Sequence, residues 1–571
     1  MNETRTTAPN HPWLAHYPEG VAWQAPLPVQ TLTEAFDTAV ATFANHRCLD
    51  FMDKHYTYRE VGRQVAYLAE GLQKLGLGKG DHVGLFLPNT PYYVIAYFAI
   101  LRIGATVVNF NPLYVERELI HQIDDSGTSI MITLDLAVLY DKLAPLLGRT
   151  ALKRIVVCRM ADCLPFPKSM LFPVVKRAEI AHHIPHDSAH LSYGSLTANF
   201  GRPKPVAIDA ETDVAVLQYT GGTTGTPKGA MLTHANLTTN ARQCVLWFPK
   251  ARPGEERMLA VLPFFHVFAM TVALNAALML GAEILLVPRF ELDDLLDLID
   301  QKKPTLFPAV PTIFSAINNH PECADHDLTS IRFCISGGAP LPGEVRRQFE
   351  AHTGCIVIEG YGLSESSPVA CITPIAGASQ PDSVGLPVPG TVIEIVSLTD
   401  DEVVLPPGER GEVCIRGPQV MKGYWNRPED TARTLKGGRL HTGDIGIMDA
   451  NGFTAIVDRI KDLIIAGGFN VYPRTVEEAI YLHPEVEEVV VAGIPDAYRG
   501  QTVKAYIKRA GDSALDETGL LAFLKDKLSP IEMPKKIEFR DSLPRTLIGK
   551  LSRKDLLEEE RLKTAGEDAL S

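Results

Sequence analysis

The chain contains 571 residues, of which 46% are hydrophobic, so it has enough apolar side chains to bury large cores and form several domains. Its 55 basic and 68 acidic residues give a formal net charge of −13, and they form no long run of lysine and arginine. This balance argues against nucleic acid as a partner.

The cysteines and the N-terminus restrict the cellular context. None of the nine cysteines belongs to a Cys-x-x-Cys pair, and several lie inside apolar runs, which predicts buried reduced thiols rather than a zinc site or disulfide framework. Residues 1–9 are polar and lack the apolar core of a signal peptide, so we expect a cytoplasmic protein.

Helical and β-rich patterns alternate in the first part of the chain. The spacing of apolar residues predicts helices at 60–75 and 92–102 and strands at 82–86, 106–108 and 130–133. This alternation is typical of α/β organisation with largely buried sheets.

Residues 164–177 combine apolar side chains, basic side chains and prolines. The prolines prevent a single long helix. Two interpretations remain open: a surface that rests on a membrane, and a loop shielded from solvent between subdomains.

Residues 219–229, Tyr-Thr-Gly-Gly-Thr-Thr-Gly-Thr-Pro-Lys-Gly, indicate a nucleotide. Glycines let backbone N–H groups converge on phosphate oxygens, while threonine hydroxyls add donors and Lys228 adds a positive charge. Pro227 and Gly229 break the Walker pattern, which argues against a P-loop NTPase. Strands predicted at 213–219 and 228–233, before a helix at 234–247, indicate that the loop joins a hairpin. The alternative is a flexible surface turn.

The apolar stretch 270–287 contains Asn275 and Glu283, so it predicts a buried helix and strand, and we expect no transmembrane segment. After Gly385, short strands at 392–396, 411–416 and 453–457 predict a β-rich subdomain. Beyond residue 461 the pattern returns to α/β, with a helix at 476–482, a strand at 487–492 and a polar tail from 558.

Five segments in order resemble the acyl-adenylating superfamily of acyl-CoA synthetases, peptide-synthetase adenylation domains and luciferases. They are residues 219–229, 359–365, 441–444, 458–464 with 467–473, and 544–550. The form of the first segment and the opening residues 12–21 look most similar to bacterial long-chain fatty acid–CoA ligases rather than to coumarate ligases.

The resemblance implies an α/β fold with two domains. Residues 1–459 would form a large N-terminal domain of stacked α/β subdomains plus a β-rich subdomain, and residues 460–571 a small mobile α+β C-terminal domain. It also implies two reactions: a carboxylate attacks the α-phosphate of ATP to give acyl-AMP and pyrophosphate, and a thiol then displaces AMP. ATP and CoA would be co-substrates, a fatty acid the carboxylate, and Mg2+ the cofactor.

The same resemblance assigns site residues. Lys550, Glu365 and Thr220 are the predicted catalytic residues, and Glu365 and Thr220 the predicted Mg2+ ligands. Tyr361 is expected to stack on adenine, and Asp444 and Arg459 to bind the ribose. The predicted ATP-binding residues are Thr220, Gly221, Gly222, Thr223, Thr224, Lys228, Gly338, Ala339, Pro340, Glu359, Gly360, Tyr361, Gly362, Ser364, Asp444 and Arg459. Ser364 stands where family members more often have threonine.

Lys550 resembles the lysine that contacts the substrate carboxylate and the α-phosphate. Lys461 is the predicted hinge, and rotation about it would replace Lys550 by Gly467 and Gly468 beside the CoA channel. Many relatives carry glutamate two residues after the proline of this motif, where this chain has Thr475.

The predicted acyl-binding residues are His266, Phe268, Met270, Gly337 and Gly362. Amino-acid-activating relatives carry an aspartate in the region of residues 264–279, whereas this chain has no acidic residue there, which argues against an amino acid substrate. Ala273, Ala276 and Ala277 share a helical face, as either the wall of an alkyl tunnel or a close helix contact. His266 is either a gate at the carboxylate end or a core histidine.

Four functions compete. A free-standing ligase for long- or medium-chain fatty acids is favoured because the chain ends soon after Lys550. The others are a fatty acyl-AMP ligase that delivers to a separate carrier protein, an aryl (4-coumarate-like) CoA ligase, and a nucleotide-binding regulator without chemistry. Peripheral contact with the inner face of the membrane and a homodimer stay open.

Overall fold

The computed structural model describes residues 11–220, 227–375, 380, 383–466, 469–496, 499–511, 513–545 and 551–568. The chain forms two compact units. The first contains residues 1–392 and 415–440, and the second contains residues 393–414 and 441–571. The boundary predicted between residues 459 and 460 separates two domains that would rotate against each other. The division into compact units does not test that rotation, so this boundary stays a prediction.

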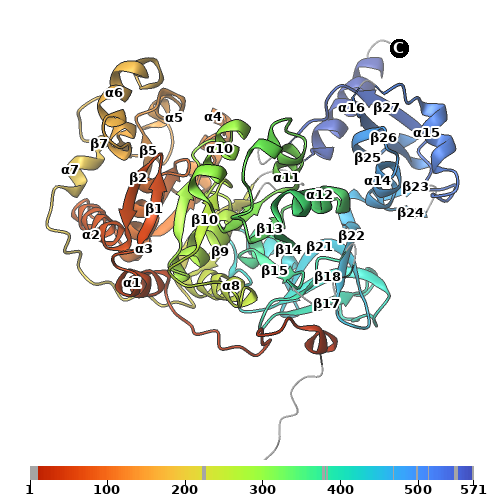
Figure 1. The fold of residues 1–571 in the computed structure, drawn as a ribbon, viewed down its shortest axis with the longest axis horizontal. Helices are drawn as coiled ribbons and strands as arrows, with labels where there is room; N and C mark the ends of the chain where they lie inside the picture. The colour runs from red at the N-terminus through yellow and green to blue at the C-terminus, as the bar shows by residue number, and fades with distance from the viewer. Residues whose placement is uncertain are drawn as a thin grey trace, which may run out of the picture. The chain divides into compact units, whose positions relative to one another are not determined.

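The first unit is built on two large sheets (Figure 1). One sheet has the order β16-β15-β14-β13-β12-β10-β11-β1-β2, and its strands are β1 (Arg47–Phe51), β2 (Lys54–Thr57), β10 (Arg257–Ala260), β11 (Glu283–Leu286), β12 (Leu306–Ala309), β13 (Phe333–Gly337), β14 (Ile356–Gly362), β15 (Val369–Ile372) and β16 (Leu386–Pro387). The other has the order β19-β9-β8-β4-β3-β5-β6-β7, with β3 (His82–Phe86), β4 (Thr106–Asn109), β5 (Ile130–Leu134), β6 (Arg154–Cys158), β7 (His190–Ser192), β8 (Val214–Thr220), β9 (Lys228–Thr233) and β19 (Gly423–Tyr424).

Helices of the first unit pack beside these sheets. They are α1 (Leu32–Thr42), α2 (Tyr58–Lys74), α3 (Pro91–Arg102), α4 (Glu116–Ser126), α5 (Ala137–Leu143), α6 (Lys168–Val175), α7 (Tyr193–Thr197), α8 (His234–Trp247), α9 (Ala277–Met279), α10 (Leu292–Lys302), α11 (Pro311–Asn318), α12 (Gly343–Thr353) and α13 (Pro428–Thr434). Short 3-10 turns are η1 (Pro12–His16), η2 (Ala144–Leu146), η3 (Met160–Cys163), η4 (Arg177–Glu179), η6 (Cys323–Asp325) and η7 (Ser364–Ser366).

Local sequence explains where these helices begin. At the start of α2, the Thr57 hydroxyl accepts from the backbone N–H of Glu60 at 3.2 Å, and the Glu60 carboxylate accepts from the backbone N–H of Thr57 at 2.8 Å. This reciprocal cap satisfies donors that the first helical turn leaves unpaired. The apolar face that follows, including Val61, Val65 and Leu68, is fully buried.

The two remaining sheets lie mostly in the second unit, although β20 and the ends of β18 and β21 belong to residues 415–440 of the first. One has the order β17-β18-β21-β20 with β22 paired to β21, from β17 (Val392–Val396), β18 (Arg410–Arg416), β20 (Leu435–Lys436), β21 (Arg439–Met448) and β22 (Thr454–Arg459). The other has the order β24-β23-β26-β25 with β27 paired to β26, from β23 (Ile464–Ala466), β24 (Phe469–Val471), β25 (Val486–Asp496), β26 (Gly500–Arg509) and β27 (Lys536–Arg540). The turn η8 (Ile460–Asp462) precedes β23.

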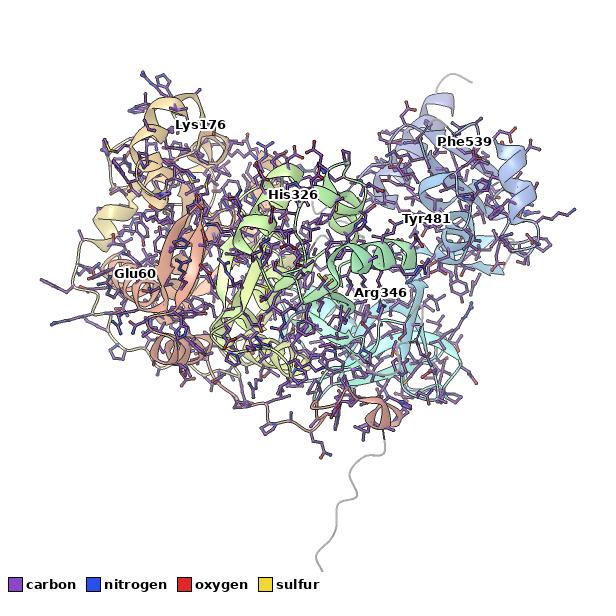
Figure 2. The ribbon with its side chains drawn as sticks, in the orientation of Figure 1. Glu60, Lys176, His326, Arg346, Tyr481 and Phe539 are labelled. Carbon is purple, nitrogen blue, oxygen red and sulfur yellow. The ribbon has the colours of Figure 1, made fainter. Side chains whose placement is uncertain are left out.

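Helices α14 (Pro473–Tyr481), α15 (Glu517–Leu524) and α16 (Arg553–Asp568) lie around β25, β26 and β27 (Figure 1). The apolar faces of α14 and α15 share a core with the strands, and Phe539, labelled in Figure 2, packs against it. Leu556 of α16 belongs to a second cluster with Val490, Ala492 and Tyr506.

The structure agrees with most of the predicted elements and corrects others. The polar tail predicted from residue 558 continues α16 as far as Asp568. The predicted helix after Met270 exists but begins as a π-helix, η5 (Ala269–Ala276). All nine cysteines are free and buried, as predicted. Among the described residues, no helix is long and apolar enough to cross a membrane.

Candidate active site

The predicted acyl- and adenine-binding segments lie at the carboxyl edge of the first large sheet. Strand β10 lies between β11 and β12 with both pairs parallel, so the strand order reverses there. Residues 262–270 follow β10 directly, and Gly338, Ala339 and Pro340 follow the parallel strand β13. In open α/β sheets, ligands bind at this edge where the strand order reverses.

Glycines at the ends of β13 and β14 allow close approach. Gly337 and Gly360 are register partners, and a Cβ at Gly337 would lie 3.0 Å from the Phe268 ring. At Gly362, a Cβ would lie 1.8 Å from the carbonyl oxygen of Pro368, so only glycine fits. The structure therefore brings the predicted acyl-binding residues Gly337 and Phe268 into contact.

The other predicted acyl-binding residues surround the start of η5. The His266 ring nitrogen Nδ1 accepts from the backbone N–H of Phe268 at 3.3 Å. Met270 is fully buried, and its sulfur lies 3.4 Å from the Asn109 amide nitrogen. In the same helix, the Thr271 hydroxyl donates to the Ser367 carbonyl at 2.6 Å, which ties η5 to the turn after Glu365.

An apolar cavity of about 30 Å³ lies beside the same helix, and none of the predicted acyl-binding residues lines it. Its lining is entirely nonpolar apart from a buried thiol and comes from α8, η5 and strands β10, β12 and β13: Cys244, Val245, Phe248, Met258, Val272, Ala276, Leu280, Leu306, Phe307, Pro308, Phe333 and Ile335. Ala276 of the predicted alanine face is part of this wall, while Ala273 and Ala277 are fully buried.

The predicted phosphate loop joins a hairpin, as expected. Strands β8 and β9 are antiparallel, with Thr220 opposite Lys228. The Thr220 hydroxyl lies 3.5 Å from the Lys228 carbonyl oxygen. Gly221, Gly222, Thr223 and Thr224 lie outside the described residues.

Glu365 and Lys228 share one neighbour, Tyr424. The Tyr424 hydroxyl donates to Glu365 Oε1 at 2.7 Å, and Lys228 Nζ lies 5.4 Å from the Tyr424 ring centroid. Burial and the Glu365 charge raise the pKa of Tyr424, so its hydroxyl keeps the proton that it donates. Lys228 Nζ also lies 3.0 Å from Asp430 Oδ2. Sequence reasoning missed Tyr424 and Asp430, because an aromatic residue in β19 looks like any core side chain.

A second missed cluster anchors the first hairpin strand. Asp125 of α4 accepts from the Tyr219 hydroxyl at 2.6 Å and from the Trp425 indole through its backbone carbonyl at 3.1 Å. Arg427 pairs with the same carboxylate at 2.6 Å. These contacts fix the base of the hairpin on α4.

The backbone just after the predicted ATP-binding residues Gly338, Ala339 and Pro340 is held by β14. Glu359 Oε2 accepts from the backbone N–H of Leu341 at 3.2 Å, directly after Pro340. Gly338 has a φ of +85°, a conformation that glycine adopts without strain. Tyr361 and Ser364 are both partly exposed near the same strand end.

In the second unit, the structure brings the predicted ribose-binding residues together. Asp444 and Arg459 are register partners on β21 and β22, and Arg459 Nε lies 2.9 Å from Asp444 Oδ1. Glu412 of β18 holds the residues just before Asp444. One of its carboxylate oxygens accepts from the Gly443 N–H at 2.9 Å, and the other lies 2.8 Å from His441 Nδ1.

The predicted hinge residue Lys461 lies in η8, whereas Gly467, Gly468 and Lys550 lie outside the described residues. Arg553, three residues after Lys550, forms a strong anchor. It donates to the Val491 carbonyl at 2.6 Å and pairs with Asp462 and Glu477, each at 2.7 Å. Arg553 thus joins the segment after Lys550 to the residue that follows Lys461.

Two family models match this chain. One, described as AMP-binding enzyme, matches residues 36–425, and the other, described as AMP-binding enzyme C-terminal domain, matches residues 475–550. The chain belongs to the AMP-binding enzyme family. The resemblance drawn from the five segments is confirmed.

Two relatives that match this AMP-binding enzyme over almost their whole length carry the same name. The long-chain-fatty-acid–CoA ligase of Bacillus subtilis is 45% identical over 96% of this chain and 98% of its own. That of Escherichia coli O6:H1 is 39% identical with the same coverage.

Solved structures confirm the fold class. ATP-bound MatB from Rhodopseudomonas palustris aligns with a TM-score of 0.81 at 28% identity, covering 93% of this chain and 99% of its own. The anthranilate CoA ligase AuaEII in complex with anthranoyl-AMP aligns with a TM-score of 0.80 at 26% identity, covering 95% and 99%.

Proposed function

We propose that this AMP-binding enzyme joins a long-chain fatty acid to CoA with ATP, through an acyl-AMP intermediate, and releases AMP and pyrophosphate. Its full-length relatives in Bacillus subtilis and Escherichia coli carry this activity in their names. The apolar cavity between η5 and strands β10, β12 and β13 is the observation that favours a long-chain fatty acid as the substrate.

The cavity favours an alkyl chain over a polar acid. Its lining offers no charged group to pair with an ammonium or second carboxylate, and burying such a group unpaired is costly. At about 30 Å³ the cavity is smaller than an alkyl chain, so the substrate would have to part η5 from the sheet. The wall of the cavity includes the π-helix η5, and π-helical segments are rare in proteins but frequent at functional sites.

In the first reaction, an oxygen of the fatty acid attacks the α-phosphorus of ATP, and the bond to the β-phosphate oxygen breaks. The residues that hold ATP are those named above at the hairpin and at the ends of β13 and β14. Lys228 would balance phosphate charge, Tyr361 would stack on adenine, and Asp444 and Arg459 would hold the ribose. Holding the reactants in line supplies much of the acceleration, up to about 7–11 kcal/mol in favourable cases.

The carboxylate of Glu365 and the hydroxyl of Thr220 fit Mg2+, which prefers hard oxygen ligands. Glu365 would hold the ion with Thr220, and the Tyr424 hydrogen bond to Oε1 orients the carboxylate for this purpose. When bound, the ion would neutralise phosphate charge. We expect chelation of Mg2+ to stop AMP release.

In the second reaction, the CoA thiolate attacks the acyl carbon, and AMP leaves with the electron pair of the broken bond. We propose that residues 460–571 rotate against residues 1–459 about Lys461 between the two reactions. Lys550 would serve the first reaction, and Gly467 and Gly468 would border the CoA channel in the second.

The test is AMP release from ATP and Mg2+ with acids from acetate to palmitate and with 4-coumarate, each with and without CoA. Turnover with long alkyl acids that requires CoA is expected. Pyrophosphate exchange without a CoA effect would favour the ligase that delivers to a carrier protein. A preference for 4-coumarate would favour the aryl ligase, and no AMP release with any acid would favour the regulator.

A further inference from the structure

Residues 164–177, here called the α6 segment, expose apolar side chains to solvent. Helix α6 (Lys168–Val175) has no buried residue. The exposed fractions are 78% for Phe166, 68% for Met170, 54% for Leu171, 74% for Val174 and 72% for Val175. Figure 1 shows α6 at the edge of the first unit near α5 and β7, and Figure 2 labels Lys176 at its end.

The exposed side chains form one helical face. Met170, Leu171, Val174 and Val175 follow the spacing that normally turns a helix toward its core. Here that face points to solvent, whereas Phe172 and Pro173 on the opposite side are partly covered. Contiguous apolar patches of this kind mark interaction sites. The structure thus overturns the interpretation of the segment as a loop shielded from solvent.

The charge of the α6 segment favours an anionic partner. It contains Lys168, Lys176 and Arg177 and no acidic residue, in a chain whose net charge is −13. Asp53 pairs with Lys168 at 3.1 Å and Glu179 with Lys176 at 2.6 Å, whereas Arg177 forms no ion pair with the part of the chain that the structure describes. Apolar side chains flanked by basic ones are the combination that inserts at the interface of an anionic bilayer.

We propose that the α6 segment is a docking surface for an anionic phospholipid bilayer. The apolar face enters the boundary between head groups and acyl chains, and the basic residues contact lipid phosphates. Docking holds the enzyme at the surface into which long-chain acids partition. The proposal is separate from the proposed function, since vesicles without any substrate test it.

The experiment measures cosedimentation of the full chain with sucrose-loaded vesicles. Wild-type protein is expected to bind vesicles of phosphatidylglycerol and phosphatidylcholine, to bind phosphatidylcholine alone about tenfold more weakly, and to lose binding as salt rises. The triple variant Phe166→Ser, Met170→Ser, Val174→Ser should bind at least about tenfold more weakly. Arg177→Gln should weaken binding about fivefold to anionic vesicles only.

Phe200→Ser is the matched control, because Phe200 is 85% exposed in the same unit and lies outside the α6 segment. It should bind like wild type. All substituted side chains are exposed, so thermal unfolding should not change, and turnover of octanoate, which is dissolved as monomers, should stay at the wild-type level.

Two results would overturn the proposal. One is wild-type protein that does not sediment with anionic vesicles, or a triple variant that sediments equally well. The other is a dimer in sedimentation equilibrium that the triple variant abolishes while vesicle binding is absent, which would assign the α6 segment to a second copy of the chain.

Discussion

Tyr424 links the two charged residues that the sequence assigns to phosphate and metal. Its hydroxyl donates to Glu365 and its ring lies against Lys228. Tyr424→Phe keeps the ring and removes only the hydrogen bond, and hydrogen bonds to charged groups contribute about 1.5–3 kcal/mol. We expect pyrophosphate exchange to fall about 10- to 100-fold at low Mg2+. The Mg2+ concentration for half-maximal exchange should rise.

Tyr92→Phe provides the control, since the Tyr92 hydroxyl donates to the backbone carbonyl of Arg159 at 3.1 Å, away from this cluster. Its Mg2+ dependence should match wild type. An unchanged Mg2+ dependence in Tyr424→Phe would show that the hydroxyl does not orient Glu365.

Asp458 gives the second unit a pH dependence. Burial raises the pKa of this carboxyl to about 6, although the backbone N–H groups of Arg474 and Arg459 donate to it. Between about pH 4 and 6 the folded protein holds a proton that the unfolded chain has released, so the free energy of unfolding falls as pH rises. The contribution of Asp458 to this fall amounts to about 3 kcal/mol and should be lost in Asp458→Asn.

Urea unfolding of wild type and Asp458→Asn across that range measures the difference. Asp541→Asn, at an exposed site of the same unit, should keep the wild-type dependence. Parallel curves for wild type and Asp458→Asn would refute the assignment.

At the scale of elements, Arg553 connects α16 to β25 and η8. Arg553→Ala would leave Asp462 and Glu477 without this partner in a partly buried site. We expect a loss of about 2–3 kcal/mol in the stability of the second unit, below the range for fully buried pairs. Adenylation should slow more than the thioester reaction, because the segment that follows Lys550 loses its anchor.

Rapid-quench measurement of acyl-AMP formation, with thermal unfolding alongside, tests this. Arg561→Ala on the same helix removes an exposed pair with Glu558 and should change neither quantity. Equal slowing of both reactions in Arg553→Ala would indicate a general loss of structure instead.

The side of the apolar cavity that η5 forms should determine which acyl chain lengths the enzyme prefers. Ala276→Phe adds volume to the cavity wall, at a cost of about 1–3 kcal/mol in stability. The ratio of kcat/KM for palmitate to that for octanoate should fall at least about tenfold. Both acids are measured in one preparation, so a general loss of active protein leaves the ratio unchanged. An unchanged ratio would place the alkyl chain elsewhere.

Sequence patterns predicted elements better than the contacts between them. The hairpin β8–β9 and helix α8 follow from apolar periodicity and glycine punctuation, which act over a few residues. The π-helix in η5 could not be predicted, because its hydrogen bonds depend on packing against α8 and β10. Tyr424 and Arg553 were missed for the same reason: their partners are distant in sequence, and one sequence does not show which side chains meet.

At the scale of the whole molecule, rotation about Lys461 would give the enzyme one conformation for each reaction, so a substitution can abolish one reaction and leave the other. Lys550→Ala is expected to abolish acyl-AMP formation, because no other group would contact the acid and the α-phosphate together. It should spare conversion of supplied acyl-AMP to acyl-CoA, since Lys550 would have left the site by then. Both half-reactions are measured by the release of AMP or pyrophosphate under single-turnover conditions.

Lys461→Pro should separate the same reactions by another route. Proline fixes φ near −65° and would hold the proposed hinge in one conformation, so one half-reaction should persist while the other is lost. Lys554→Ala, at an exposed lysine of α16, is the control and should keep both. Loss of both half-reactions in Lys550→Ala, with Lys554→Ala active, would contradict rotation, because one fixed arrangement would then serve both steps.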